Sequence, residues 1–441
     1  MTRRELVGRL MAGALTVIAV DQTAMRGPAG ARNAVERWRH DFPGLQDSTE
    51  DSRFVYLDSA ATTQRPTAVL NALLGFYEHG NSNPSKTQHA MARRAYDQYQ
   101  AARQKLAHFI NAPSADEVVW VRGTTEGVNL IASAWAGTVL RAGDEILLTV
   151  AEHASNLLPW RLAVEHTGAL LRFIDVDDEG RISLEDLDRK LSARTRLVAF
   201  SHVSNVAGYV NPAAEICARA RRAGARTFID AAQSVPHAFL DVQAIGCDFL
   251  AFSSHKMLGP MGVGVLWARA ELLESMRLYQ SGSNMAHAID LDTQQFEHGA
   301  YKFGAGTPNA AGAIAMAAAV DYLESLGRDA IRAHEEHLTG YALERLGNVP
   351  KLRLLGPRQA KDRIPVFSFD VAGIGAEELM RDLDARGVAI RAGDLSALPL
   401  LKHFGVREAA RASCYLYTSE SDIDSFIEAL HQSIAKRSGV S

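Results

Sequence analysis

The sequence predicts an α/β protein in which a large, mostly parallel sheet of seven strands is followed by a smaller α/β domain. Apolar runs of strand length recur through the middle of the chain, and helical patterns such as residues 213–224 fill several of the gaps. A second, shorter set of strands and helices follows a long helical pattern at residues 310–327. We therefore expect a large domain over residues 51–325 and a small C-terminal domain over residues 326–441.

Residues 1–50 are irregular in pattern, and we expect them to form an N-terminal arm that can pack against the small domain. Paired arginines and an apolar stretch at residues 10–20 make residues 2–20 similar to a twin-arginine export signal, which is too short to span a bilayer. Arg9 interrupts this pattern, and no convincing cleavage site follows. We therefore favour a cytoplasmic protein and keep export as the alternative.

The strands of the large sheet are predicted from short apolar runs bounded by polar or turn residues. These runs lie at residues 117–121, 145–150, 171–176, 196–203, 226–231, 249–253 and 262–267. Most of the gaps are long enough for a crossover helix, which favours parallel neighbours. The last two runs are too tightly linked for a crossover, so we expect them to be antiparallel or a hairpin.

The small domain is predicted to mix strands with helices. The strands are expected at residues 364–371 and 413–417, and the helices at residues 375–387 and 420–436. The segment TSESD supplies an N-cap residue and early acidic residues for the last helix.

Composition excludes several classes of function. The chain has 441 residues with 47 Lys plus Arg against 51 Asp plus Glu, so its formal charge of −4 predicts neither a nucleic-acid nor a membrane-surface partner. Its three cysteines, Cys217, Cys247 and Cys414, show no CxxC spacing and predict neither a disulfide framework nor a zinc site. We expect no metal site.

Lys256 is the first candidate for chemistry, because it lies between two apolar runs that are typical of buried strands. A desolvated lysine has a lowered pKa and becomes a nucleophilic amine. Such lysines form Schiff bases with carbonyl compounds, including pyridoxal 5'-phosphate (PLP). The alternative is that the stem of Lys256 is buried while its ammonium group reaches water; the apolar flanks favour the first interpretation.

A PLP site also needs an acid for the pyridine nitrogen, donors for the phosphate and a flat group against the ring. Asp230 ends a predicted strand, where ligands of open α/β sheets bind, and Gln233 could donate to the phenolic oxygen. Asp230 could equally cap a helix. Its interval to Lys256 matches one βαβ step, so both side chains would come from neighbouring strand ends.

Phosphate donors are predicted at the start of a helical pattern, where Gly123, Thr124 and Thr125 offer hydroxyl and backbone N–H groups. A plain capping box is the alternative. Ser253 and His255 flank Lys256 and could reach the same phosphate. His153 is a flat group suited to stack on the ring, although a lone histidine in a loop is more often structural.

These motifs together resemble the fold-type-I PLP enzymes of aminotransferase class V, and within them the cysteine desulfurase and selenocysteine lyase branch. The resemblance runs from about residue 55 to about residue 435. It is carried by VYLDSAATTQRP (55–66), RGTTEGVNL (122–130), EHASNLLPW (152–160), HVSNVAGYVNP (202–212), DAAQSVPH (230–237), SSHKMLGPMGVGVLW (253–267), FGAGTPN (303–309) and RASCYLYTS (411–419).

The resemblance implies a role for each matching position. Lys256 would hold PLP as a Schiff base and shuttle protons, Asp230 would pair with the pyridine nitrogen, and His153 would stack on the ring. Gln233 and Asn205 would approach the phenolic oxygen and the substrate. The phosphate would be bound by Thr124, Thr125, Ser253 and His255, joined by Thr307 of the partner subunit. Such a shared contact implies a homodimer with shared active sites.

The substrate side departs from the family pattern. The resemblance implies that Arg411 binds the α-carboxylate of an amino acid, for which its two-pronged donor is suited. The desulfurase loop Arg-x-Gly-x-x-Cys-Ala-x-Pro appears as RAGDLSALP from Arg391 onward, so Ser396 stands at the position of the persulfide-forming cysteine. A serine alkoxide is far harder to form than a thiolate. Arg391 and Ser396 are therefore expected to line the substrate pocket.

The leading hypothesis is a PLP-dependent enzyme that acts on an L-amino acid through an external aldimine and a Cα carbanion. Carbon–sulfur lyase chemistry by β- or γ-elimination fits, because it needs no persulfide cysteine. One alternative is a cysteine desulfurase proper that uses Cys414 or an acceptor thiol. Others are a biosynthetic class V aminotransferase, epimerase or γ-replacement enzyme, and a non-catalytic scaffold that has kept the fold.

Overall fold

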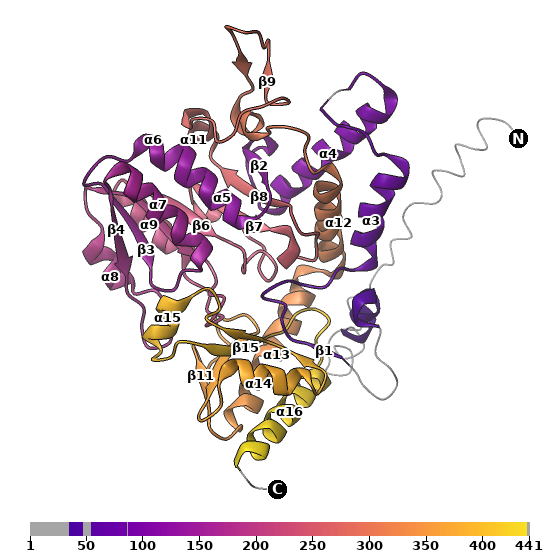
Figure 1. Ribbon diagram of the computed structural model, residues 1–441, viewed down its shortest axis with the longest axis vertical. Helices are drawn as coiled ribbons and strands as arrows, with labels where there is room; N and C mark the ends of the chain where they lie inside the picture. Colours follow the sequence, from indigo (N-terminus) through magenta and orange to yellow (C-terminus); the bar gives the residue numbers. More distant parts are fainter. Residues whose placement is uncertain (1–34, 47–53, 86, 439–441) are drawn as a thin grey trace, which may run out of the picture.

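The computed structural model describes residues 35–46, 54–85 and 87–438, so the predicted export signal lies outside the described residues. Figure 1 shows a large α/β domain above a smaller one, with strands of both domains facing each other across the middle of the molecule. No described helix combines the length and the apolar character needed to cross a bilayer.

The large sheet has seven strands in the order β2-β8-β7-β6-β5-β3-β4. They are β2 (Val118–Val121), β3 (Glu145–Thr149), β4 (Leu170–Ile174), β5 (Thr195–Ser201), β6 (Arg226–Asp230), β7 (Phe249–Ser253) and β8 (Gly264–Ala268). Strands β4, β3, β5, β6 and β7 run parallel, while β8 is antiparallel to both β7 and β2. All seven predicted strands and the antiparallel closing pair are confirmed.

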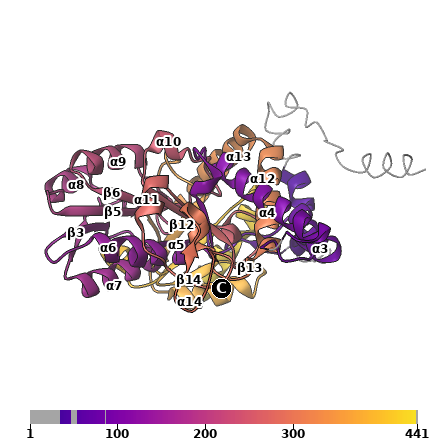
Figure 2. The same cartoon turned by 90° about the horizontal axis from the view of Figure 1, so that it is seen from above.

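Helices cover both faces of this sheet because alternate strand residues are apolar on both sides. Phe228 packs in a cluster with Trp160, whereas its neighbour Ile229 packs in the opposite cluster with Ile216. Figure 2 shows α8, α9 and α10 along one face and α5, α6 and α7 along the other. Their bounds are α5 (Thr124–Leu130), α6 (Gly137–Val139), α7 (Leu158–Thr167), α8 (Leu184–Lys190), α9 (Ala213–Arg222) and α10 (Val242–Ile245).

A helical layer flanks the β2 end of the large sheet and leads into the small domain. It consists of α3 (Thr67–His79), α4 (Ala90–Phe109), α12 (Ala310–Leu326) and α13 (Arg328–Gly347). Helix α12 matches the predicted helix, and its many alanines allow α3 and α4 to pack closely against it. Helix α11 (Ala270–Ser275) and the hairpin of β9 (Ala286–His287) and β10 (Gln295–Phe296) precede it, and the hairpin projects from the body in Figure 1.

The small domain contains an antiparallel sheet in the order β11-β12-β15-β14. Its elements are β11 (Leu352–Leu355), β12 (Val366–Val371), α14 (Ala376–Asp384), β13 (Val388–Ala389), β14 (Arg391–Gly393), α15 (Leu398–His403), β15 (Ala409–Ser413) and α16 (Glu420–Ser438). The predicted strand at residues 364–371 and both predicted helices are confirmed.

The predicted strand at residues 413–417 is wrong, because the strand is β15 and ends at Ser413. Beyond it the chain turns, with Thr418 N donating to Tyr415 O over 2.9 Å and Tyr415 N donating to Thr418 Oγ1 over 3.0 Å. The apolar run is buried because Tyr415 and Tyr417 pack in the core cluster of the large domain. Their burial comes from packing between the domains and not from sheet pairing.

A short N-terminal segment links the two domains near their common edge. Strand β1 (Val55–Tyr56) pairs in parallel with β13 of the small domain, and Asp58 forms an isolated bridge with Ser413. The chain then crosses to the large domain, where Thr63 N donates to His255 O over 3.0 Å. This path brings Asp58 beside β15 and the segment after it beside Lys256.

Candidate active site

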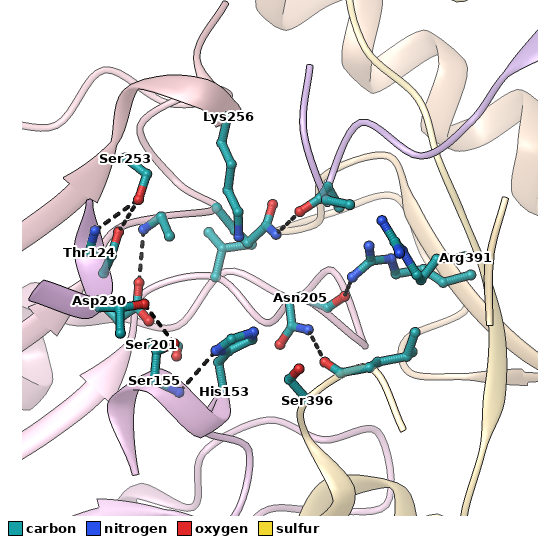
Figure 3. A pocket seen from close by; sticks show the side chains of 18 of the residues that line it. Thr124, His153, Ser155, Ser201, Asn205, Asp230, Ser253, Lys256, Arg391 and Ser396 are labelled. Atoms are coloured by element: carbon teal, nitrogen blue, oxygen red, sulfur yellow. Dashed lines mark hydrogen bonds between the residues drawn. The ribbon is translucent and has the colours of Figure 1, made fainter. Parts of the chain in front are cut away.

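A cavity of about 450 Å³ lies between the carboxyl ends of the large-sheet strands and the small-domain strands β14 and β15. In Figure 3, Thr124 and Ser253 lie at one end, Arg391 lies at the other, and Lys256 points in between them. The predicted residues that line it are Thr124, Thr125, His153, Asn205, Asp230, Gln233, Ser253, His255, Lys256, Arg391, Ser396 and Arg411.

Lys256 and Asp230 come from adjacent strand ends, as predicted. Lys256 ends a short turn directly after β7, and Asp230 is the last residue of β6 and lies opposite Ala251. Burial lowers the pKa of Lys256 to about 8, against the opposing effect of the Asp230 charge. The amine is therefore close to losing its proton near neutral pH, which a nucleophile or a base requires.

Asp230 is only 6 % exposed, and burial raises its pKa. One carboxylate oxygen accepts a hydrogen bond from Ala232 N at 2.9 Å, and the charge of Lys256 also favours its ionised form. A buried carboxylate is stable as an anion only with a compensating positive charge nearby. A protonated pyridine nitrogen would supply that charge, so this position fits the ring of PLP.

Hydroxyl and amide groups gather at the Thr124 end of the cavity. Ser253 Oγ accepts from Thr124 N at 2.8 Å and lies 2.9 Å from Thr124 Oγ1. Helix α5 begins at Thr124 without a side-chain cap, so its threonine hydroxyls are not used for capping. A Cβ at Gly264 would lie 2.5 Å from Phe252 O and 2.8 Å from the Cα of Gly123, so the Gly123 backbone can lie against β8 only beside a glycine. These donors suit a phosphate.

His153 presents a flat, uncharged ring to the cavity. It caps a short turn, since its Nδ1 accepts from Ser155 N at 3.1 Å. Burial lowers the pKa of His153 to about 4, and the charges of Lys256 and Arg411 act in the same direction. At neutral pH the ring is therefore neutral, which suits it to pack face to face with an electron-poor aromatic ring.

Three further predicted residues line the cavity, and the side chain of each forms a hydrogen bond within the protein. Gln233 Nε2 donates to Ala60 O over 2.7 Å, and Thr125 Oγ1 donates to Ser155 Oγ over 2.8 Å. His255 Nδ1 lies 3.3 Å from Thr62 Oγ1. Gln233 keeps one amide N–H and His255 one ring nitrogen for a ligand.

Arg391 and Arg411 lie opposite each other on β14 and β15 and share one carboxylate. Asp58 Oδ2 is 2.7 Å from Arg391 Nη2, and Asp58 Oδ1 is 3.4 Å from Arg411 Nη2. Arg411 is 4 % exposed, its Nη1 donates to Asn205 O over 3.1 Å, and its Nε has no hydrogen-bond partner. A buried donor without a partner costs about 1–3 kcal/mol, which a bound carboxylate would recover.

Two hydrogen bonds hold the loop that carries Ser396 against the large domain. Asn205 Nδ2 donates to Leu395 O over 2.9 Å, and Ala154 N donates to Ser396 O over 2.7 Å. Leu395 and Ser396 both have left-handed backbones, with φ of 50° and 53°. Such residues cost roughly 1–2 kcal/mol each, so the hydrogen bonds hold a strained loop in place. Figure 3 shows Ser396 beside Asn205 and His153.

Thr307 lies outside this cavity. Its Oγ1 accepts from Asn83 Nδ2 at 3.2 Å, and it lines a different hollow with Trp120 and Tyr279. Within one chain it therefore contacts none of the proposed phosphate donors, and its role at a partner's site stays a prediction.

Sequence reasoning did not single out Asp58 or Glu152. Glu152 is 2 % exposed and accepts hydrogen bonds from Thr149 Oγ1, from Asn156 Nδ2 at 2.7 Å and from Ser201 Oγ at 2.7 Å. Burial raises the pKa of Glu152 to about 7. Its network fixes the segment that carries His153. Both acids lie in recognisable motifs, but nothing local in those motifs indicates their distant partners.

Comparison with known proteins agrees with this arrangement. The family model described as aminotransferase class-V matches residues 55–426. A probable cysteine desulfurase of Synechocystis sp. is 44 % identical over 90 % of this chain and 94 % of its own length. The crystal structure of a cysteine desulfurase from Escherichia coli is 36 % identical with a TM-score of 0.84, covering 91 % of this chain and 98 % of that one. A cysteine desulfurase from Thermococcus onnurineus is 32 % identical with a TM-score of 0.86, over 91 % and 98 %.

Proposed function

The chain belongs to the aminotransferase class-V family of PLP-dependent enzymes, and from that premise we propose that it cleaves the carbon–sulfur bond of cysteine or a cysteine derivative by elimination. The observation that carries this proposal is the composition of the cavity wall. A lysine amine with a pKa of about 8 and a buried arginine with a free Nε face the cavity, while a serine stands in the loop. None of the three cysteines lines the cavity.

The cofactor would be held by residues that already surround the cavity. Asp230 would bind the pyridine nitrogen, and the neutral ring of His153 would pack on the pyridine ring. Gln233 and Asn205 would approach the phenolic oxygen. The phosphate would be held by Thr124, Thr125, Ser253 and His255, with Thr307 of the partner subunit.

Bound PLP supplies an electron sink for the electrons left at the substrate Cα. Arg411 binds the α-carboxylate through two N–H groups and thereby orients the Cα–H bond. Lys256 Nζ accepts the Cα proton, because burial holds its pKa near 8. The loop at Ser396 forms one side of the cavity.

Elimination needs no nucleophile from the loop. The Cα–H and Cβ–S bonds break, a Cα–Cβ double bond forms, and the sulfur leaves as a thiol with the proton that Lys256 returns. Water then hydrolyses the released enamine to a 2-oxo acid and ammonia. A serine at the loop position is sufficient for this sequence, because no covalent bond to the departing sulfur is formed.

A desulfurase reaction proper, with alanine and enzyme-bound sulfur as products, is the second candidate, because the relatives carry that name. It requires a thiolate at the substrate sulfur. Cys414 is 2 % exposed in the core of the small domain, and burial raises its pKa strongly. Transamination, epimerisation or γ-replacement would use the same lysine and arginine, and a scaffold would need neither.

Product analysis separates these candidates. With cysteine as substrate we expect pyruvate, ammonia and sulfide in equal amounts, no alanine and no persulfide on any peptide, measured by mass spectrometry. A Ser396→Cys variant should acquire a persulfide at that position and release alanine, because a thiol would then face the cavity. The control variant Cys414→Ala should keep the wild-type products. Alanine release that disappears in Cys414→Ala would overturn the elimination proposal in favour of a desulfurase.

We further propose that the enzyme is a homodimer with shared active sites, on the basis of Thr307. An equimolar mixture of Lys256→Ala and Thr307→Val chains, refolded together, should form hybrid dimers in which one site has neither defect. Random pairing would restore about a quarter of the wild-type sites. Activity at limiting PLP is the measurement, and the separately refolded variants are the control. A mixture no more active than the sum of its parts would contradict sharing.

A further inference from the structure

The carboxylates around the cavity differ in how their charge is balanced. Asp58 is ion-paired to both arginines, at 2.7 Å and 3.4 Å, and the buried Asp230 interacts with Lys256. Asp394 lines the same cavity beside Ser396, yet no lysine or arginine among residues 35–46, 54–85 and 87–438 forms an ion pair with it. Unlike the buried Asp230, Asp394 is exposed, and its charge acts on the neutral His153 rather than on a lysine or arginine among the described residues.

The position of Asp394 is fixed by the loop. Its Oδ1 accepts from Ser396 N at 2.9 Å, and Ala397 N donates to its backbone oxygen over 2.9 Å. The next residue, Leu395, is buried and receives the hydrogen bond from Asn205. Because Gly393 pairs with Ala409 before it and Asn205 holds Leu395 after it, the Asp394 carboxylate is held at one place on the cavity wall while its second oxygen stays available.

The other residues that line the cavity have proposed roles toward the cofactor or the substrate carboxylate. Thr124, Ser253 and Asp230 face the cofactor end, and Arg411 faces the α-carboxylate. Arg411 also touches Asn205 O, and Asn205 in turn holds Leu395, so the loop lies directly beside the carboxylate position. A substituent on the substrate Cβ would therefore lie beside the segment from Asp394 to Ser396.

We propose that Asp394 selects substrates whose side chain ends in a positively charged group, such as a protonated amine. This inference rests on the proposed function and adds a preference, among its substrates, for cysteine derivatives with a cationic tail. Arg391 does not cancel the attraction, because Asp58 already engages its Nη2 at 2.7 Å and its Nε at 3.4 Å. The cavity therefore has a positively charged group, Arg411, for the substrate carboxylate, and a negatively charged side chain, Asp394, beside the position of the substrate side chain.

The test compares lysine with norleucine, which has the same carbon chain without the ammonium group. Neither carries a leaving group on Cβ, so binding to the PLP-loaded enzyme can be measured by calorimetry without carbon–sulfur cleavage. In Asp394→Asn, which keeps the acceptor for Ser396 N, lysine should bind about fivefold more weakly, the size of a partly solvated ion pair. Norleucine affinity should not change, and the fivefold effect should shrink as salt is raised.

The matched control is Asp97→Asn, which removes the same charge from an exposed position on α4 and should leave both affinities unchanged. Equal losses for lysine and norleucine in Asp394→Asn, or no loss for either, would overturn the assignment of Asp394 while the amino-acid site stands. Failure of lysine to bind the wild-type enzyme more tightly than norleucine would overturn this inference, whereas the proposed function is overturned separately, by the products formed from cysteine.

Discussion

Replacement of Lys256 by alanine should reduce turnover by about 10²–10⁴-fold or more, the contribution of a positioned proton-transfer group. Lys256 is placed at the end of β7 beside Asp230, and burial lowers its pKa to about 8. In its absence the described cavity wall offers no other lysine to accept the Cα proton. Arginine at this position should be equally inactive, because it keeps the charge but does not release its proton. Steady-state formation of the 2-oxo acid is the measurement.

Lys302 is the internal control for this prediction. It is 7 % exposed and burial lowers its pKa too, but its Nζ donates to Glu274 O at 2.9 Å and Met276 O at 2.8 Å, away from the cavity. Borohydride treatment of the PLP-loaded protein followed by peptide mapping should mark Lys256 and leave Lys302 unmarked. A mark on Lys302, or an unmarked Lys256 in fully loaded protein, would show that desolvation alone does not define the reactive lysine.

The large sheet could be predicted because its signals are local. Each strand is a short apolar run, and the gap lengths distinguish crossovers from the tight β7–β8 link. The positions of Asp230 and Lys256 followed from the same periodicity. The family, its fold type and its dependence on PLP, expected from ordered motifs, are confirmed by relatives about 40 % identical over most of the chain.

Features that depend on contacts between distant segments could not be predicted. Asp58 meets Arg411 only because β1 joins β13 and Asp58 bridges to Ser413. The run after Ser413 was interpreted as a strand because it is apolar, yet its tyrosines are buried by the other domain. Glu152 likewise gains its partner Ser201 from the pairing of β3 with β5. In each case packing between elements, rather than local pattern, determines the environment.

Replacement of Arg411 should weaken substrate binding more than any other change on the small-domain side of the cavity. Removing one member of a buried, hydrogen-bonded charge pair costs about 2–5 kcal/mol, which raises KM by roughly 30- to 5000-fold. The Arg411→Lys variant should bind substrate as weakly, because a single ammonium group cannot reproduce the forked pair of N–H groups of arginine. PLP content should stay at the wild-type level, since Arg411 lies at the opposite end of the cavity from Thr124.

Arg391→Gln provides the comparison that separates carboxylate binding from a general loss of positive charge. The Arg391 side chain is 49 % exposed and is already paired with Asp58, so its removal should raise KM by only about fivefold. Arg411 is buried and its Nε has no hydrogen-bond partner among the described residues, so a bound carboxylate would add to its hydrogen bonding. If both variants raised KM equally, the combined positive charge of the two arginines, and not the hydrogen-bond geometry of Arg411, would bind the substrate carboxylate.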